Sequence, residues 1–252
     1  MCAVYANRQL FLSFIAWCLI GAFLSQIESV YTAIGQDPEV AKLATRFVHI
    51  TFPFHLFEVC NNVFSSNFAS AQRVTHYGAI TLSIATVAHG LMSYYFVFVL
   101  DWDFDGVCWA TGLMFMLRGT IGVSLVKFGG RFPTHDDVYL FSRETVSNLW
   151  PLLKIDLQGV AMGVWGWWAF DIFTLMATYL GPDQVGAQTI MRSIGLWSFM
   201  MPVGFAFACG IYFNNNLGEG RPQVCMQYYN VALVFALMVT VIQITAFYFG
   251  ME

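Results

Sequence analysis

The fold class is decided by residues 149–182, which read LWPLLKIDLQGVAMGVWGWWAFDIFTLMATYLGP. Between Asp156 and the Gly181-Pro182 break, the one charged side chain is Asp171. At about 1.5 Å per residue, a helix over residues 153–180 is roughly 40 Å long, which is enough to cross a bilayer core of about 30 Å with some tilt. A carboxylate half-way along such a helix is costly in lipid, so it should face protein or water. The stretch therefore predicts a membrane-spanning helix.

The composition of the whole chain supports the same environment. Hydrophobic residues make up 58% of the 252 residues and charged residues only 10%, whereas a soluble domain carries about 25% charged residues. So few charges cannot cover the surface in water, and we expect a multi-pass integral protein of a plasma or vacuolar-type membrane. The six cysteines lie in or beside apolar runs, without the spacing of a zinc site or a disulfide framework. No basic patch indicates nucleic acid as a partner.

Seven apolar runs are long enough to cross a bilayer, roughly at residues 9–27, 45–66, 77–100, 107–127, 151–180, 185–211 and 224–249. Lys and Arg concentrate in every second connection, and acidic residues in the others. By the positive-inside rule, the N-terminus and the connections 67–76, 128–148 and 214–223 are cytoplasmic, and the C-terminus is outside. Lys42 and Arg46 are exceptions on the outer side, with acidic residues close by.

The connection 128–148 differs from the others because it is the longest and contains Gly129-Gly130 and Pro133. We interpret it as a joint between two parts of an all-α, polytopic membrane helix bundle. Residues 1–128 then form a part with four spans, residues 129–148 a cytoplasmic connection, and residues 149–252 a part with three spans. Within and beside the connection, residues 139–149 are predicted to form a short interfacial helix.

Several motifs, taken in order along the chain, resemble one transporter family. They are Ile34–Ala41 (IGQDPEVA), Pro53, Gly106–Thr111 (GVCWAT), Leu153-Lys154-Ile155 followed by Trp167–Asp171 (WWAFD), Met201–Gly204 (MPVG) and Asn215–Pro222 (NNLGEGRP). Together they resemble the multidrug and toxic compound extrusion (MATE) family of cation-coupled antiporters. The resemblance implies that the chain corresponds to helices three to nine of a twelve-helix, two-bundle fold whose halves meet at residues 128–148.

Two positions depart from the family pattern that this resemblance implies. Many members have an acidic residue just before the Trp-Trp pair, where it takes part in proton or sodium coupling, but this chain has Gly166. A proline of the pattern is replaced by Gln158. Asp171 matches a second family acid, yet five helical residues correspond to about 500°, so Asp171 points some 140° away from position 166. Coupling by the usual family route is therefore not expected here.

Polar and aromatic side chains within the runs are the candidate substrate-binding and ion-coupling residues. Asp171 can exchange a proton for an organic cation, or it can serve as a structural hydrogen-bond acceptor. His55, Glu58 and Asn62 have the spacing i, i+3, i+7 of one helix face, and such a stripe should line a cavity or a helix contact. Trp167 and Trp168 could provide a cation–π surface, with packing or lipid contact as the alternative.

Two arginines within the runs are predicted to have a structural role. Arg118 and Arg192 each need a partner in the membrane, and Glu58 and Asp171 are the acids available to them. Charge pairing that holds the bundle together is the interpretation we favour. We expect no metal site and no cofactor beyond a coupling proton or sodium ion.

These observations favour a transporter that exports organic cations or xenobiotics in exchange for protons or sodium by alternating access. The chain shows no nucleophile–base arrangement, so an enzyme is not expected. One alternative is an incomplete transporter fragment without activity of its own, whose missing helices are absent or come from a partner. A seven-span receptor is the weaker alternative, because the charge bias places the N-terminus inside and the receptor motifs Asp/Glu-Arg-Tyr and Asn-Pro-x-x-Tyr are missing.

Overall fold

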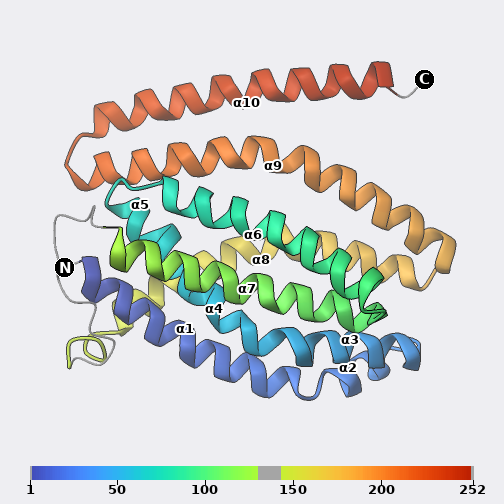
Figure 1. Ribbon diagram of the computed structural model, residues 1–252. Helices are drawn as coiled ribbons and strands as arrows, with labels where there is room; N and C mark the ends of the chain where they lie inside the picture. Colours follow the sequence, from blue (N-terminus) through green and yellow to red (C-terminus); the bar gives the residue numbers. More distant parts are fainter. Residues whose placement is uncertain (1, 130–142, 251–252) are drawn as a thin grey trace. The chain divides into compact units, whose positions relative to one another are not determined.

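The computed structural model describes residues 2–129 and 143–250 of the chain, and every regular element in these ranges is helical. The prediction of an all-α fold is therefore confirmed. The elements, shown in Figure 1, are α1 (Cys2–Leu24), α2 (Ile27–Ala33), α3 (Pro38–Thr51), η1 (Phe52–Phe54), α4 (His55–Asn61), η2 (Asn62–Phe68), α5 (Ala69–Ala71), α6 (His76–Tyr94), η3 (Tyr95–Val99), α7 (Asp103–Phe128), α8 (Trp150–Thr178), α9 (Pro182–Gly218) and α10 (Pro222–Gly250).

Six helices in the described ranges are long and apolar enough to cross a membrane: α1, α6 with η3, α7, α8, α9 and α10. The remaining predicted run, residues 45–66, is helical but is not one regular helix. It belongs to the uninterrupted series α3–η1–α4–η2–α5 from Pro38 to Ala71, which we call the segmented helix. Pro53 lies in the 3₁₀ turn η1, since its missing N–H interrupts α-helical hydrogen bonding. A wider π-helical turn, η2, follows α4.

The chain forms two compact units, residues 1–156 and 157–252, which we call the N-unit and the C-unit. Their boundary falls inside the first two turns of α8. The predicted division into parts ending at residue 128 and beginning at residue 149 stays a prediction. Most of the predicted connection, residues 130–142, lies outside the described residues. Residues 143–149 form turns and bends, so the part of the predicted interfacial helix that can be seen is not helical.

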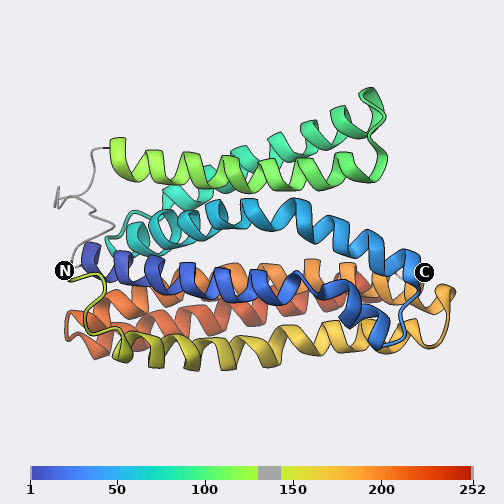
Figure 2. The ribbon, with the colours of Figure 1, turned by 90° about the horizontal axis from the view of Figure 1, so that it is seen from below.

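Within the N-unit, α7 contacts both α6 and the segmented helix. Figure 2 shows α6 and α7 as an antiparallel hairpin, closed at residues 100–102 after the π-turn η3. Glycines on α7 allow the close approach to the segmented helix. A Cβ atom at Gly112 would lie 2.6 Å from the Phe54 ring, and one at Gly119 would collide with the backbone carbonyl of Phe57. Small residues at such a contact are typical of membrane helix packing.

The end of the N-unit that is predicted to lie outside is fixed by caps and ion pairs. Asp37 caps α3, since its Oδ1 accepts a hydrogen bond from the backbone N–H of Glu39 at 2.8 Å. Arg46 pairs with Asp105 at the start of α7. Lys42 pairs with Glu39 at 3.3 Å. Both basic residues that depart from the positive-inside pattern are thus neutralised by acidic neighbours.

The C-unit contains most of α8 together with α9 and α10. Figure 1 shows α9 and α10 side by side over part of their length, and two stacked ring pairs join them. Phe205 stacks on Phe235 and Tyr212 on Tyr228, each with 5.3 Å between ring centroids. The most apolar stretches of α9 and α10 have no buried residue. Because these surfaces are apolar, in a membrane they must be covered by lipid or protein.

Candidate functional site

A buried ion pair joins the segmented helix to α7 in the N-unit. Glu58 lies in α4, and its side chain is only 9% exposed. Its Oε1 atom is 2.8 Å from Nη1 of Arg118, whose side chain is 19% exposed. Of the two acids expected to be available to Arg118, the structure pairs it with Glu58. Two buried charges cost several kcal/mol each to remove from water, so each depends on the other for compensation.

Further polar groups lie on the same buried face as Glu58. Asn61 and Ser65 are 1% and 0% exposed, and Asn61 Oδ1 faces the backbone of Gly122 on α7. Four atoms, Glu58 Oε2, Asn61 Oδ1, Ser65 Oγ and Arg118 Nε, are buried without a hydrogen-bond partner within the described ranges. A buried polar atom without a partner costs about 1–3 kcal/mol. These four residues, here called the Glu58 cluster, are therefore buried polar groups whose hydrogen bonding is incomplete within the described ranges.

The predicted stripe of His55, Glu58 and Asn62 is only partly realised. His55 and Asn62 are exposed. The His55 ring lies 5.0 Å from that of Phe115 on α7. Asn61 and Ser65 were missed, although their distances of three and seven residues from Glu58 give the same helical spacing. The signal that selects them is the set of glycines on α7.

A second ion pair joins α8 to α9 within the C-unit. Asp171 Oδ1 accepts a hydrogen bond from Arg192 Nη2 at 2.6 Å, and Thr174 Oγ1 lies 3.4 Å from Nη1 of the same arginine. The Asp171 side chain is 57% exposed and that of Arg192 is 30% exposed. The second expected arginine–acid pair is thus also present. In contrast to Glu58, Asp171 is accessible to a species that approaches the surface of the C-unit.

The tryptophans beside Asp171 lie on open surface of the C-unit. Trp167 makes an edge-to-face contact with Phe199 of α9, with 6.2 Å between ring centroids. Trp167 is 46% exposed and Trp168 is 60% exposed. A Cβ atom at Gly166 would meet nothing within 4 Å. Packing among the described residues therefore does not require a glycine at position 166.

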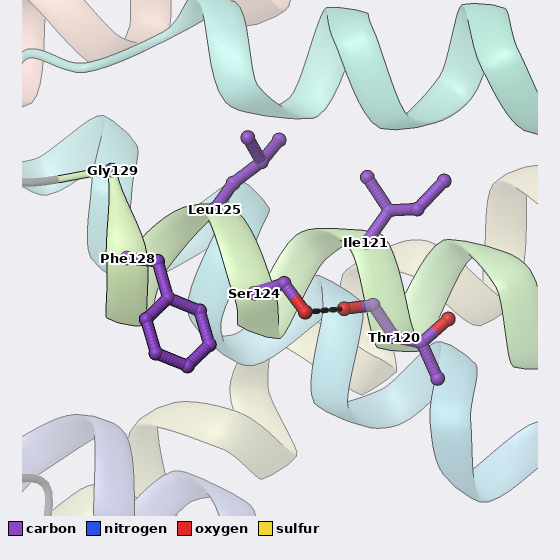
Figure 3. A pocket seen from close by; sticks show the side chains of 6 residues that line it. All are labelled: Thr120, Ile121, Ser124, Leu125, Phe128 and Gly129. Carbon is purple, nitrogen blue, oxygen red and sulfur yellow. Dashed lines mark hydrogen bonds between the residues drawn. The ribbon is translucent and has the colours of Figure 1, made fainter.

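A shallow hollow of about 440 Å³ lies elsewhere, along the last turns of α7. Figure 3 shows the side chains that line it, which belong to Thr120, Ile121, Ser124, Leu125, Phe128 and Gly129. Its hydroxyl groups are already bonded within α7, since Ser124 Oγ donates to the Thr120 carbonyl at 2.6 Å. At 100° per residue these positions lie mainly on the face of α7 opposite Gly119 and Gly122. The hollow is thus separate from the Glu58 cluster.

Comparison with known proteins gives concordant results. The zebrafish (Danio rerio) Multidrug and toxin extrusion protein 1 is 23% identical over 243 residues, which cover 96% of this chain and 40% of that protein. The Arabidopsis thaliana Protein DETOXIFICATION 1 is 26% identical over 208 residues, covering 82% of this chain and 43% of that protein. The chain thus spans less than half the length of these curated relatives. The first name describes extrusion of drugs and toxins, which supports the prediction that the chain is not an enzyme.

The fold comparison agrees with the sequence comparison. The crystal structure of the eukaryotic MATE transporter AtDTX14 superposes with a TM-score of 0.82 at 19% sequence identity, covering 99% of this chain and 55% of that one. The two-bundle architecture implied by the motifs therefore has a solved counterpart. The MatE family model matches residues 1–95 and 161–251, which is well over half of the sequence. The chain is therefore an integral, multi-pass membrane protein that belongs to the MatE family.

Proposed function

We propose that the chain acts as a membrane antiporter that exports small organic cations or other xenobiotics, by alternating access, in exchange for protons or sodium ions. Membership of the MatE family and the names of its relatives support the transport part of this proposal. The coupling part is based on one observation, the buried pair of Glu58 and Arg118.

The coupling argument begins with the charge balance of the Glu58 cluster. In the described state, the carboxylate of Glu58 is compensated by the guanidinium of Arg118. A proton or a sodium ion that reaches Glu58 competes with Arg118 for the same carboxylate. Once that cation is bound, Arg118 is left uncompensated in a buried site, which is unfavourable by several kcal/mol. Cation binding therefore favours a conformation in which α7 and the segmented helix separate, and this links the ion to the conformational change.

The C-unit provides the groups that suit an organic cation. Asp171 offers an accessible carboxylate, and Trp167 and Trp168 offer exposed aromatic rings on the same helix. Arg192 occupies the Asp171 carboxylate in the described state, so a cationic substrate would displace it. In this scheme Glu58 couples the ion and Asp171 binds the substrate. The two roles are thus assigned to different units.

The test uses the purified full chain in sealed liposomes with an imposed pH gradient or, separately, an imposed sodium gradient. Accumulation of a fluorescent organic cation is followed in each case. We expect gradient-driven accumulation by the unaltered chain. Glu58→Gln should abolish the dependence on the gradient, because the amide cannot exchange a cation. Asp171→Asn should keep the gradient dependence but raise KM by about tenfold, equivalent to roughly 1.4 kcal/mol of lost binding.

Glu28→Gln is the matched control, since Glu28 is an exposed residue in the short helix α2. It should transport as the unaltered chain does. Uptake that is driven by neither gradient in the unaltered chain would contradict independent antiport. Uptake in Glu58→Gln that still follows the gradient would remove Glu58 from the coupling role. The gradient that drives accumulation, of protons or of sodium ions, identifies the coupling ion.

A further inference from the structure

Pro202 removes one backbone hydrogen bond from the middle of α9. Because proline has no N–H, the carbonyl four residues earlier, that of Ser198, loses its usual helical partner. A side chain from the neighbouring helix replaces that partner. The amide Nε2 of Gln243 in α10 donates a hydrogen bond to the Ser198 carbonyl at 2.8 Å, and it lies 3.6 Å from Sδ of Met201.

The position of Gln243 in α10 makes this contact significant. Among the long helices of the described ranges, α10 contains the most apolar stretch. Ile242 and Ile244 flank Gln243 on either side. A polar amide at such a place is costly in lipid unless it has a partner. Freed carbonyls in proline-containing membrane helices are similarly costly and need a partner from a neighbouring element. The bond between Gln243 and Ser198 meets both needs at once.

This bond also lies where the contacts of α9 change from one neighbour to the other. The ion pair and the ring contact that α9 makes with α8 involve Arg192 and Phe199. Its hydrogen bonds and ring contacts with α10, among the described side chains, begin at Ser198 and continue through Phe205 to Phe213. Figure 1 shows α9 bending part-way along its length while α10 runs on almost straight.

We propose that Gln243 is a positioning residue that replaces the backbone hydrogen bond lost at Pro202 and so fixes the hinge of α9 against α10. The half of α9 beyond the hinge stays packed on α10. The half that contains Arg192 turns about the hinge together with its contacts to α8. The hinge itself is inferred from the fold. Only its role, to let part of α9 move during transport, rests on the proposed antiport function.

The test is hydrogen–deuterium exchange of the purified full chain in detergent micelles, followed at the amides of residues 199–206. Gln243→Leu removes the donor and should speed their exchange by roughly three- to tenfold, the range expected for one interhelical hydrogen bond in a membrane protein. Thr245→Val is the control on the same helix, since Thr245 bonds only to the Val241 carbonyl of α10 at 2.8 Å. It should leave these amides unchanged.

A second substitution separates the hinge role from general packing. Pro202→Ala restores a backbone N–H that can bond to the Ser198 carbonyl. The hydrogen bond from Gln243 is then no longer needed to satisfy that carbonyl. In the Pro202→Ala background, Gln243→Leu should therefore change exchange by less than about twofold, a strong departure from additivity. An equal effect in both backgrounds, or no effect in either, would overturn the inference.

These readouts need no transport, so they are independent of the proposed function. A chain that fails to transport but shows the non-additive exchange supports the hinge and contradicts only the antiport proposal. In a chain that does transport, Gln243→Leu should lower the turnover rate while leaving KM within about twofold, because the residue contacts no substrate-binding group. A raised KM with unchanged turnover would contradict a role in the conformational step.

Discussion

Each unit contains one ion pair between an arginine and an acidic residue, and the two pairs differ in burial. In the N-unit, the Glu58–Arg118 pair is enclosed between helices that glycines bring close together. In the C-unit, the Asp171–Arg192 pair lies on open surface beside exposed tryptophans. Removal of one partner from the buried pair should lower the free energy of unfolding more, because the remaining charge stays out of water. In the exposed pair the Asp171 carboxylate is open to a competing partner, which suits a group that binds and releases a ligand.

Removal of one arginine from each pair should show the largest difference between the units. Arg118→Met leaves Glu58 charged and buried, and should lower the free energy of unfolding by about 3–5 kcal/mol. Arg192→Met should cost clearly less, because the Asp171 side chain is 57% exposed and is not enclosed between helices as Glu58 is. Chemical or thermal unfolding in the same detergent measures both.

The double variant Glu58→Gln with Arg118→Met checks the cause of that difference. It removes both charges and should recover most of the stability lost in Arg118→Met alone. If the double variant is as unstable as Arg118→Met, the loss comes from packing of the arginine side chain, and burial of charge does not explain the contrast.

The close helix contact provides the next comparison. Gly119→Ala places a Cβ atom against the backbone of Phe57, which forces α7 away from α4 and should cost about 1–3 kcal/mol. Gly163→Ala in α8 is its counterpart, because a Cβ atom there meets nothing within 4 Å. That change should be neutral or stabilise by up to about 1 kcal/mol. Thermal unfolding of the two variants under the same conditions measures both changes in stability. Equal changes would contradict the tight packing of the N-unit.

The smallest effect is expected for an exposed pair within the N-unit. The side chains of Arg46 and Asp105 are 60% and 31% exposed, so Arg46→Ala should cost about 0.2–1 kcal/mol and the difference should shrink as salt is added. This variant tests whether burial, rather than membership of the N-unit, decides the energy of a pair. A loss as large as that of Arg118→Met would contradict the explanation.

Much of the helix layout was predictable from the sequence, because apolar runs in a membrane chain end where polar residues begin. The run expected at 151–180 became α8 (Trp150–Thr178), and that expected at 77–100 became α6 with η3. The segmented helix was predicted less well. Pro53 was visible as a break, but the π-turn at Asn62–Phe68 depends on which neighbour the helix meets, and no local pattern specifies that.

The candidate site was predictable in its charges but not in its neutral members. Arg118 and Arg192 could be expected to pair with Glu58 and Asp171, since a charge in lipid needs a counter-charge, but which arginine meets which acid was not predictable. The choice of Asn61 and Ser65, rather than His55 and Asn62, depended on which residues of the segmented helix are buried at the contact with α7. Gly119 and Gly122 determine that choice by permitting contact. The spacing of residues along a helix is compatible with either set of polar residues, and only the packing against α7 distinguishes the two sets.

The pairing of Glu58 with Arg118 also has a consequence for biosynthesis. The two residues are 60 positions apart in the sequence. At a synthesis rate of about 5–20 residues per second, the segmented helix emerges roughly 3–12 seconds before its counter-charge. During that interval Glu58 lacks the arginine with which it pairs in the described structure. The charge of the segmented helix is therefore compensated by Arg118 only once α7 has been synthesised.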